Sequence, residues 1–233
     1  MEVEAEDKGH RHGNFPNYYS FHPPQNRLLL LEQCGLMDYI RRGLSGIEIK
    51  SSPRKKARVD DNASAAGAAA DAAAVEETSA SIKEKDDIIY YCDLGCNEGD
   101  LTMAMAKALS INEQNVRCLG LDIDATLTQR GNNKYSRKQS DDNSERKEYM
   151  PVFKDCNLCS DDEHNNACSI FFADVTKAQQ DSIPREMFSL TSIFSTTMWI
   201  HIHSGDEGLT KFLERACGWT KKYLLIEPQH SGW

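Results

Sequence analysis

The sequence lacks any apolar run long enough to cross a membrane. A spanning helix needs roughly 20 mostly apolar residues, and no stretch of this chain approaches that length. The acidic amino terminus also differs from a secretory signal peptide, which begins with positive charge followed by an apolar segment. We therefore expect no membrane partner, and we expect the 8 cysteines to be reduced thiols in a cytosolic or nuclear protein.

Positive charge and apolar side chains are also scarce. The chain has 27 Lys and Arg against 36 Asp and Glu, a formal net charge of -9. This excludes an overall basic nucleic-acid binder, so any RNA contact must use a local patch. Hydrophobic residues make up 39% of the 233 residues, which is low for a fully compact chain. We therefore expect one α/β domain together with disordered segments.

Composition divides the chain into four regions. Residues 1–13 are polar, and we expect a disordered tail. Residues 14–49 carry aromatics and an amphipathic stretch that predicts a helix leading into the core. Residues 50–87 are of low complexity and predict a disordered insertion. Its basic run at 53–58 favours a solvated linker, with a nuclear import signal or an RNA contact as alternatives. Residues 88–233 form the predicted catalytic core.

Residues 88–99 carry the most informative pattern in the chain. An apolar run ends in Asp93, Gly95 and Gly99 follow, and helix-forming sequence covers residues 101–109. This order predicts a buried parallel strand, a glycine-rich turn and a helix. Glycine lets the backbone pass close to a ligand. Such a turn lies where doubly wound α/β folds bind nucleotides.

Acidic residues near this turn indicate the kind of nucleotide. A second predicted strand, 116–122, ends in Asp122, and an acid at that place can hold ribose hydroxyls. In place of the dinucleotide fingerprint G-x-G-x-x-G, the chain has Asp93 before the turn and Glu98 inside it. Two acids would repel a pyrophosphate, and they suit a cofactor with a cationic end such as S-adenosylmethionine. The alternative is a strand, turn and helix without a ligand.

The rest of the core alternates strands and helices, which predicts a mostly parallel sheet. In chain order we expect a helix over 126–135, a polar insertion over 136–168, strands over 169–174 and 190–194, a helix from Asp206 and a strand over 223–227. The fold class is therefore α/β and Rossmann-like.

Six motifs resemble the Bicoid-interacting protein 3 family of S-adenosylmethionine-dependent methyltransferases of RNA 5′-terminal phosphates. They lie at residues 14–28, 93–97, 121–124, 197–201, 205–209 and 227–229. The resemblance covers residues 14–49 and 88–231 and implies the class I methyltransferase fold. Family members continue beyond the last motif into further strands and a helix. Because this chain stops at Trp233, we expect it to lack those strands.

Two branches of this family differ in the RNA end that they methylate. The triphosphate-capping branch carries a lysine where this chain has Met198 and an arginine where it has His22. Losing both positive charges fits a monophosphate end, which has less charge to neutralise. The resemblance thus implies an RNA 5′-monophosphate methyltransferase of small RNAs, such as precursor microRNA or histidine transfer RNA. We expect a monomer in the cytoplasm, with the nucleus as the alternative.

The resemblance also implies which residues bind the cofactor. Arg27 would pair with the cofactor carboxylate, because a guanidinium can bind a carboxylate with two parallel bonds. The other positions are Asp93, Gly95 and Asn97 at the methionine part, Asp122 and Asp124 at the ribose, Asp174 and Val175 at the adenine, and Phe194 near the sulfonium. Alternative roles are a surface arginine for Arg27, a helix cap for Asp174 and plain core for Phe194.

The candidates for the phosphate grip, and so for catalysis, are Tyr18, His22 and His201. A phosphate oxygen is already anionic near neutral pH, so alignment and charge stabilisation can supply most of the catalysis. Histidine can donate a hydrogen bond in its neutral or charged form near pH 7. A buried structural role is the alternative for His201. His203 stands where the family is expected to have asparagine, so it is not a candidate.

A possible metal site lies in the predicted insertion. Cys156, Cys159, His164 and Cys168 have nearly the spacing of a zinc knuckle. The segment lacks the glycine and aromatic residues of such knuckles, so we expect a reduced, solvated loop and no metal.

Three other functions stay open. One is a non-catalytic RNA-binding or scaffold protein with the same fold, and another is a 5′-triphosphate capping enzyme. A methyltransferase of small molecules or proteins is disfavoured, because residues 18–27 match the RNA-phosphate family.

Overall fold

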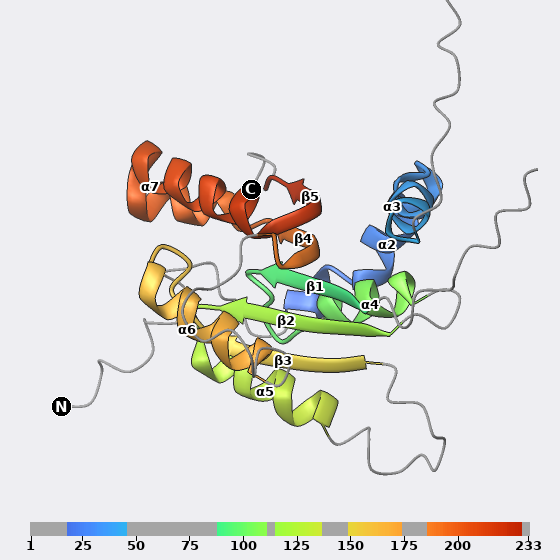
Figure 1. Cartoon of the computed structure of the whole chain (residues 1–233), viewed down its shortest axis with the longest axis horizontal. Helices are drawn as coiled ribbons and strands as arrows, with labels where there is room; N and C mark the ends of the chain where they lie inside the picture. The colour runs from blue at the N-terminus through green and yellow to red at the C-terminus, as the bar shows by residue number, and fades with distance from the viewer. Residues whose placement is uncertain (1–17, 46–87, 111–114, 137–148, 174–185, 230–233) are drawn as a thin grey trace, which may run out of the picture.

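The computed structural model describes residues 18–45, 88–110, 115–136, 149–173 and 186–229 (Figure 1). The predicted tail, the predicted insertion at 50–87 and the adenine positions Asp174 and Val175 lie outside these residues. In the part of the chain that is described, no helix is both long and apolar enough to cross a membrane.

Five parallel strands form a single sheet. They are β1 (Ile89–Leu94), β2 (Val116–Asp122), β3 (Tyr149–Asp155), β4 (Phe188–Phe194) and β5 (Thr220–Glu227). Their order is β3-β2-β1-β4-β5, which Figure 1 shows from bottom to top. The chain builds outward from β1 on one side and then returns to its other side with β4. This change of direction places a ligand-binding crevice at the carboxyl ends of β1 and β4. The predicted α/β class with a parallel sheet is confirmed.

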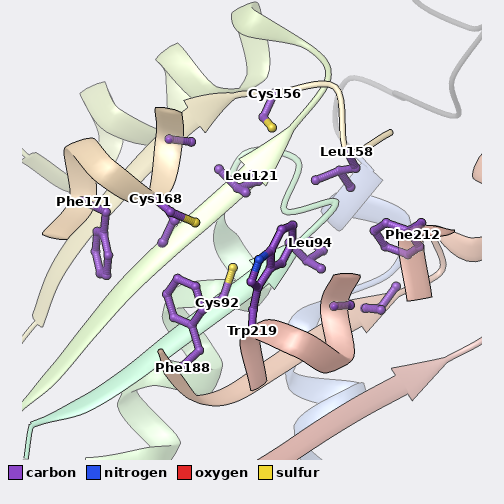
Figure 2. Close-up of a cluster of buried hydrophobic side chains, with 14 of the residues drawn as sticks. Cys92, Leu94, Leu121, Cys156, Leu158, Cys168, Phe171, Phe188, Phe212 and Trp219 are labelled. Atoms are coloured by element: carbon purple, nitrogen blue, oxygen red, sulfur yellow. The ribbon is translucent and has the colours of Figure 1, made fainter. Parts of the chain in front are cut away.

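Helices pack on both faces of the sheet and complete two separate cores. The amino-terminal helices are α1 (Tyr18–Phe21), α2 (Pro24–Gln33) and α3 (Leu36–Leu44), and the others are α4 (Asp100–Leu109), α5 (Ala125–Ser136), α6 (Asp161–Phe172) and α7 (Thr197–Trp219). One core joins α3 and α4 to the sheet through residues such as Met37 and Met105. The other joins α6 and α7 to the opposite face, where Trp219 lies among Cys92, Cys168 and other buried side chains (Figure 2).

The third strand is not where the sequence pattern places it. The prediction of a strand at 169–174 is wrong, because residues up to Phe172 belong to α6 and β3 lies at 149–155. Ser160 caps α6 by accepting a hydrogen bond from the Glu163 amide, and three acids in its first turn suit the positive helix end. The region predicted as a polar insertion, 136–168, therefore contains β3 and much of α6.

One aromatic side chain of strand β3, Phe153, packs directly against the backbone at three glycines. The Phe153 ring is buried, and a Cβ placed on Gly99 or Gly120 would come within 2.2 Å or 2.5 Å of it. A Cβ on Gly131, in α5, would lie 3.2 Å from the same ring. Only glycine at these places lets the ring approach so closely, so Phe153 links β3 to the glycine turn, to β2 and to α5.

Helix α7 consists of two helical parts that meet at Gly205. This glycine has φ 63° and ψ -169°, which no helical residue adopts. The sequence predicts only the second part, from Asp206. The first part begins at Thr197, directly after the end of β4, and its position brings it to the ligand-binding edge.

Candidate functional site

A cavity of about 340 Å³ opens at the carboxyl edge of the sheet, where the topology predicts a ligand. Its walls come from α1, α2, the turns after β1 and β2, the loop between β3 and α6, the end of β4 and the first part of α7. The lining residues that the argument uses are Tyr18, Arg27, Asp93, Gly95, Asn97, Asp122, Asn157, Phe194, Trp199, His203 and Ser204. Most of the predicted cofactor positions that the structure describes therefore meet in one place.

The glycine turn after β1 forms the floor of the cavity. Gly95 has φ 88°, and a Cβ there would lie 2.0 Å from Thr196 Oγ1. The Gly95 amide donates to the Leu121 carbonyl at 2.7 Å, which ties the turn to β2. Asn97 also has a positive φ, 53°, and its side-chain oxygen accepts a hydrogen bond from the Glu98 amide at 2.8 Å. The turn is thus held in a conformation that brings its backbone to the cavity.

Asp122 at the end of β2 is suited to hold hydroxyl groups. It is buried, and its two carboxylate oxygens accept from the amides of Asn97 at 2.8 Å and Asp124 at 3.1 Å. Burial raises the pKa of the Asp122 carboxyl to about 6. Each carboxylate oxygen has a further lone pair, so the ionised group can also accept from a ribose.

Asp124 lies next to Asp122, as the resemblance implies. It is not among the residues that line the cavity. Its side chain accepts from the Thr126 amide at 2.8 Å, which caps the amino end of α5. Its own amide orients Asp122, so Asp124 supports the ribose position indirectly.

Asp93 lines the cavity but is largely engaged with protein. Its carboxylate accepts from the hydroxyls of Ser192 at 2.6 Å and Thr102 at 2.5 Å. These bonds join β1 to β4 and to α4. Burial raises the pKa of the Asp93 carboxyl. Asp93 therefore holds the sheet and helix α4 together beside the glycine turn.

Arg27 extends from α2 into the cavity wall, where it contacts Glu227 at the end of β5. Its Nε donates to both carboxylate oxygens of Glu227, at 3.0 and 3.2 Å. Its Nη2 donates to Tyr18 OH and to Ser195 Oγ, both at 2.9 Å. The alternative of a surface arginine is wrong, since the side chain is only 17% exposed.

The candidates for the phosphate grip are separated by the structure. Tyr18 lines the cavity, and the His22 ring packs against it with centroids 4.8 Å apart. His201 is exposed, pairs with Asp206 at 2.6 Å across the Gly205 kink and does not line the cavity. His203, which sequence comparison leaves aside, does line it.

Sequence reasoning also missed the wall formed by the first part of α7. Trp199, Ile200, His203 and Ser204 all line the cavity. Their spacing of three to four residues is that of one helix face, and this period could have revealed them had the helix been predicted from Thr197. Asn157 and Cys159 were missed because the strand that precedes them was placed elsewhere.

The cysteine and histidine residues of the possible zinc knuckle are not gathered into a site. Cys168 Sγ lies 3.7 Å from His164 Nδ1, whereas Cys159 is exposed and contacts Ser204 Oγ at 3.3 Å. His164 is buried and stacks on Trp219. Across the described ranges, no group of three or more potential metal ligands occurs. The expected solvated loop is wrong, because His164 and Cys168 lie in α6.

The parallel sheet with its reversal beside β1, the glycine turn and the acid at the end of β2 define a Rossmann-like α/β fold with a ligand site at the carboxyl edge of the sheet. Residues 188–232 match the family model described as Bicoid-interacting protein 3 (Bin3). This match confirms the family resemblance that the motifs predict. This partial match agrees with the prediction of S-adenosylmethionine as the cofactor.

Curated relatives match over nearly the whole chain. The chain is 26% identical over 235 residues to a pre-miRNA 5′-monophosphate methyltransferase of Danio rerio, covering 97% of this chain and 69% of that protein. It is 26% identical over 226 residues to an RNA 5′-monophosphate methyltransferase of Rattus norvegicus, covering 93% of this chain and 59% of that protein. The chain thus spans about three-fifths to two-thirds of the length of these relatives.

Solved structures are more distant. One is phosphoethanolamine N-methyltransferase 1 of Haemonchus contortus in complex with phosphoethanolamine and S-adenosylhomocysteine, at 11% identity and TM-score 0.40, covering 61% of this chain and 22% of that chain. Another is a SAM dependent methyltransferase from Aquifex aeolicus, at 16% identity and TM-score 0.36, covering 62% of this chain and 61% of that chain. The fold assignment rests on the strand order rather than on these scores.

Proposed function

We propose that this chain transfers the methyl group of S-adenosylmethionine to an oxygen of an RNA 5′-monophosphate. One observation carries the proposal. A single cavity is lined by the glycine turn, by Asp122, by Arg27 and by neutral hydrogen-bonding side chains. The names of the curated relatives support the same reaction.

The cofactor half of the cavity has the right chemistry for S-adenosylmethionine. Asp122 would accept from the ribose hydroxyls, and Arg27 would hold the carboxylate of the methionine part. Asn97 and the Gly95 backbone lie along the turn between them. The cofactor supplies an electrophilic methyl group on a sulfonium, which favours an acidic environment such as the one formed by Asp93 and Asp122.

The acceptor half favours a phosphate of low charge. Among the lining residues that the structure describes, Arg27 has the only fixed positive charge, and that charge is paired with Glu227. The other donors there, including Tyr18, Trp199 and Ser204, are neutral. A triphosphate would bring more negative charge close to Asp93 and Asp122 with no further fixed cation to offset it.

Transfer needs little proton chemistry. The bond from sulfur to carbon breaks as the bond from phosphate oxygen to carbon forms, and the oxygen is already anionic near neutral pH. The residues have only to align the three atoms and keep water out. Trp199 and Phe194 give the cavity an apolar part next to the donors.

The test is methylation of short hairpin RNAs by the purified chain with radiolabelled S-adenosylmethionine. The RNAs differ only in a 5′-monophosphate, triphosphate or hydroxyl. Label on the monophosphate RNA alone is the expected result. Label on the triphosphate RNA would replace the proposal with capping. No label, with cofactor binding intact by calorimetry, would favour an RNA-binding or scaffold role.

A further inference from the structure

Glu227 joins the last described strand to the first described helices. It ends β5, and its carboxylate receives the Arg27 Nε–H on both oxygens. Ser195 Oγ, which accepts from Arg27 Nη2, also lies 3.4 Å from Glu227 Oε1. Side chains from α2, from the end of β4 and from the end of β5 therefore form one hydrogen-bonded group at the cavity wall.

The backbone holds this group in a fixed geometry. Ser195 has φ 55°, a positive value that a residue with a Cβ adopts at a cost. Its amide donates to the Glu227 carbonyl at 2.9 Å, which aligns the ends of β4 and β5. The Arg27 guanidinium carbon lies 5.7 Å from the Tyr18 ring centroid and 5.8 Å from that of Phe194. The guanidinium is therefore limited in position by two rings and by three acceptors.

We propose that Glu227 is a positioning residue of the cofactor site, acting through Arg27. This inference rests on the proposed function, because the group that Arg27 would bind is the cofactor carboxylate. Arg27 uses Nε and Nη2 on its protein partners. Because a guanidinium has five N–H donors in a fixed fork, holding two of its nitrogens also fixes Nη1, which remains to bind a carboxylate in the cavity.

Removing the Glu227 carboxylate has two consequences. The mostly buried Arg27 charge would keep only hydroxyl partners, Tyr18 and Ser195, so the fork would lose its bidentate acceptor and its orientation. The cofactor carboxylate would gain from the loss of a nearby negative charge. We expect orientation to dominate, because Glu227 is 40% exposed and solvent screens its charge, whereas its bonds fix the geometry.

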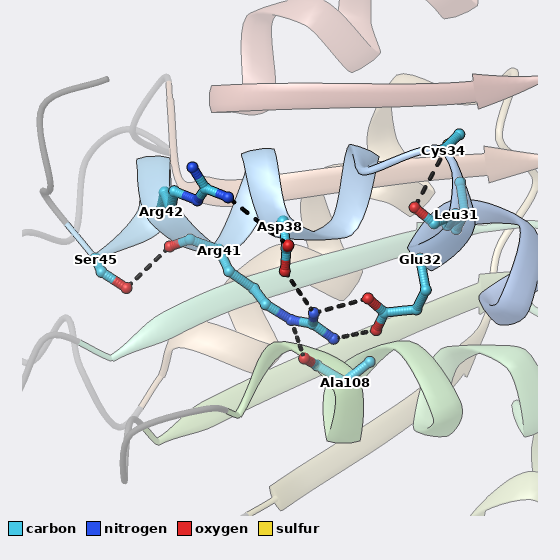
Figure 3. Close-up of polar contacts among 8 residues, drawn as sticks. All are labelled: Leu31, Glu32, Cys34, Asp38, Arg41, Arg42, Ser45 and Ala108. Atoms are coloured by element: carbon cyan, nitrogen blue, oxygen red, sulfur yellow. Dashed lines mark hydrogen bonds and ion pairs between the residues drawn. The ribbon is translucent and has the colours of Figure 1, made fainter. Parts of the chain in front are cut away.

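A second arginine–glutamate pair, which also involves helix α2, offers a matched control. Arg41 of α3 pairs with Glu32 of α2 and with Asp38, and its Nε donates to the Ala108 carbonyl of α4 at 2.8 Å (Figure 3). Neither Arg41 nor Glu32 lines the cavity. Glu32→Ala therefore removes a carboxylate from an arginine pair that fastens α2 without touching the cofactor site.

The experiment measures S-adenosylhomocysteine binding to the full chain by calorimetry, for the wild type and for Glu227→Ala, Glu227→Gln and Glu32→Ala. We expect Glu227→Ala to raise Kd about tenfold or more, a change of roughly 1.4 kcal/mol. Glu227→Gln keeps a side-chain oxygen for Arg27 Nε, so its Kd should rise less than about threefold. Glu32→Ala should leave Kd within about twofold. In methylation assays, Glu227→Ala should raise KM for S-adenosylmethionine much more than it lowers kcat.

Several results would overturn the inference. They are unchanged or tighter binding by Glu227→Ala, an equal loss in Glu32→Ala, or a wild type that does not bind S-adenosylhomocysteine. A thermal melt without ligand checks that each variant folds. If the alanine variant does not fold, Glu227→Leu, which fills the space but offers no acceptor to Arg27, gives the test with the same expected rise in Kd. The expected binding pattern without RNA methylation would contradict the proposed function alone.

Discussion

At the scale of single residues, the protonation state of Asp122 should affect both the stability of the fold and the affinity for the cofactor. Burial raises the pKa of its carboxyl to about 6, and two backbone amides partly oppose that rise. A raised carboxyl pKa means that the folded chain takes up this proton more readily than the unfolded chain. Asp122 therefore contributes more to stability below about pH 4 than above pH 6. Cofactor binding should follow the opposite course, because the ionised form accepts from ribose hydroxyls.

We predict that affinity for S-adenosylhomocysteine falls as the pH drops through about 6. Calorimetry between about pH 8 and pH 5 would show the change. Asp122→Asn should bind more weakly at about pH 8 and should show a flatter pH profile, since its amide does not titrate in this range. Equal pH profiles for the two proteins would contradict the assignment of Asp122 to the ribose.

Two histidines two positions apart on α7 give a second residue-scale prediction. His203 lines the cavity, whereas His201 is exposed and pairs with Asp206. His203→Ala should lower kcat/KM for 5′-monophosphate RNA about tenfold, because it alters the acceptor wall, and should leave S-adenosylhomocysteine binding unchanged. His201→Ala is the control and should stay within about threefold. The reverse order of effects would restore His201 as the phosphate contact.

At the scale of elements, the sequence predicts four of the five strands because each is rich in apolar, aromatic or β-branched residues. β1, β2, β4 and β5 follow this rule. β3 does not, since it contains Pro151 and Lys154, and among residues 151–155 only Phe153 is buried. The short apolar run at 169–172 is equally compatible with a strand or a helix face. Ser160, followed by three acidic residues, is a typical helix start, and this signal favours a helix over a strand for the run that follows.

Phe153 is the residue that makes β3 part of the cofactor site. Phe153→Ala should destabilise the fold by about 3 to 5 kcal/mol, because the ring is buried against rigid backbone that cannot collapse into the space. It should also weaken cofactor binding, since the ring supports Gly99 of the turn. Urea unfolding measures the first effect. Phe21→Ala is the control, as that side chain is 80% exposed and should cost less than about 0.5 kcal/mol.

At the scale of the whole molecule, some residues of the site lie close together in the sequence, near strand ends, whereas others are brought together from distant parts of the chain. Gly95, Asn97 and Asp122 can be predicted because each lies within a few residues of a strand end. The partner of Arg27 cannot, because it is 200 residues away and belongs to a motif with no local sign of that contact. The cavity wall of α7 lies in the part before Gly205, where the sequence pattern predicts no helix.

Global stability should depend on one histidine in the core between α6, α7 and the sheet. His164 is buried against Trp219, and burial, helped by the charge of Arg215, lowers its pKa to about 3. Protonation therefore favours the unfolded chain, whose histidine has an ordinary pKa of about 6.5. Stability from this residue is complete above that value and is lost as the pH falls toward 3.

We predict that His164 alone lowers the free energy of unfolding by roughly 2 kcal/mol between pH 7 and pH 5. His164→Phe keeps a flat ring on Trp219 and should lack that part of the acid loss. Urea unfolding followed by tryptophan fluorescence at several pH values would show the difference in slope. Parallel slopes for the two proteins would mean that His164 becomes protonated without unfolding.

The contact between Arg27 and Glu227 also sets an order of events during synthesis. Arg27 leaves the ribosome before its partner Glu227, which follows 200 residues later. At synthesis rates of about 5 to 20 residues per second, that interval is on the order of 10 to 40 seconds. During this time the cofactor cannot bind as it does in the finished site. Cofactor binding therefore cannot stabilise a nascent chain of this protein until Glu227 has been made.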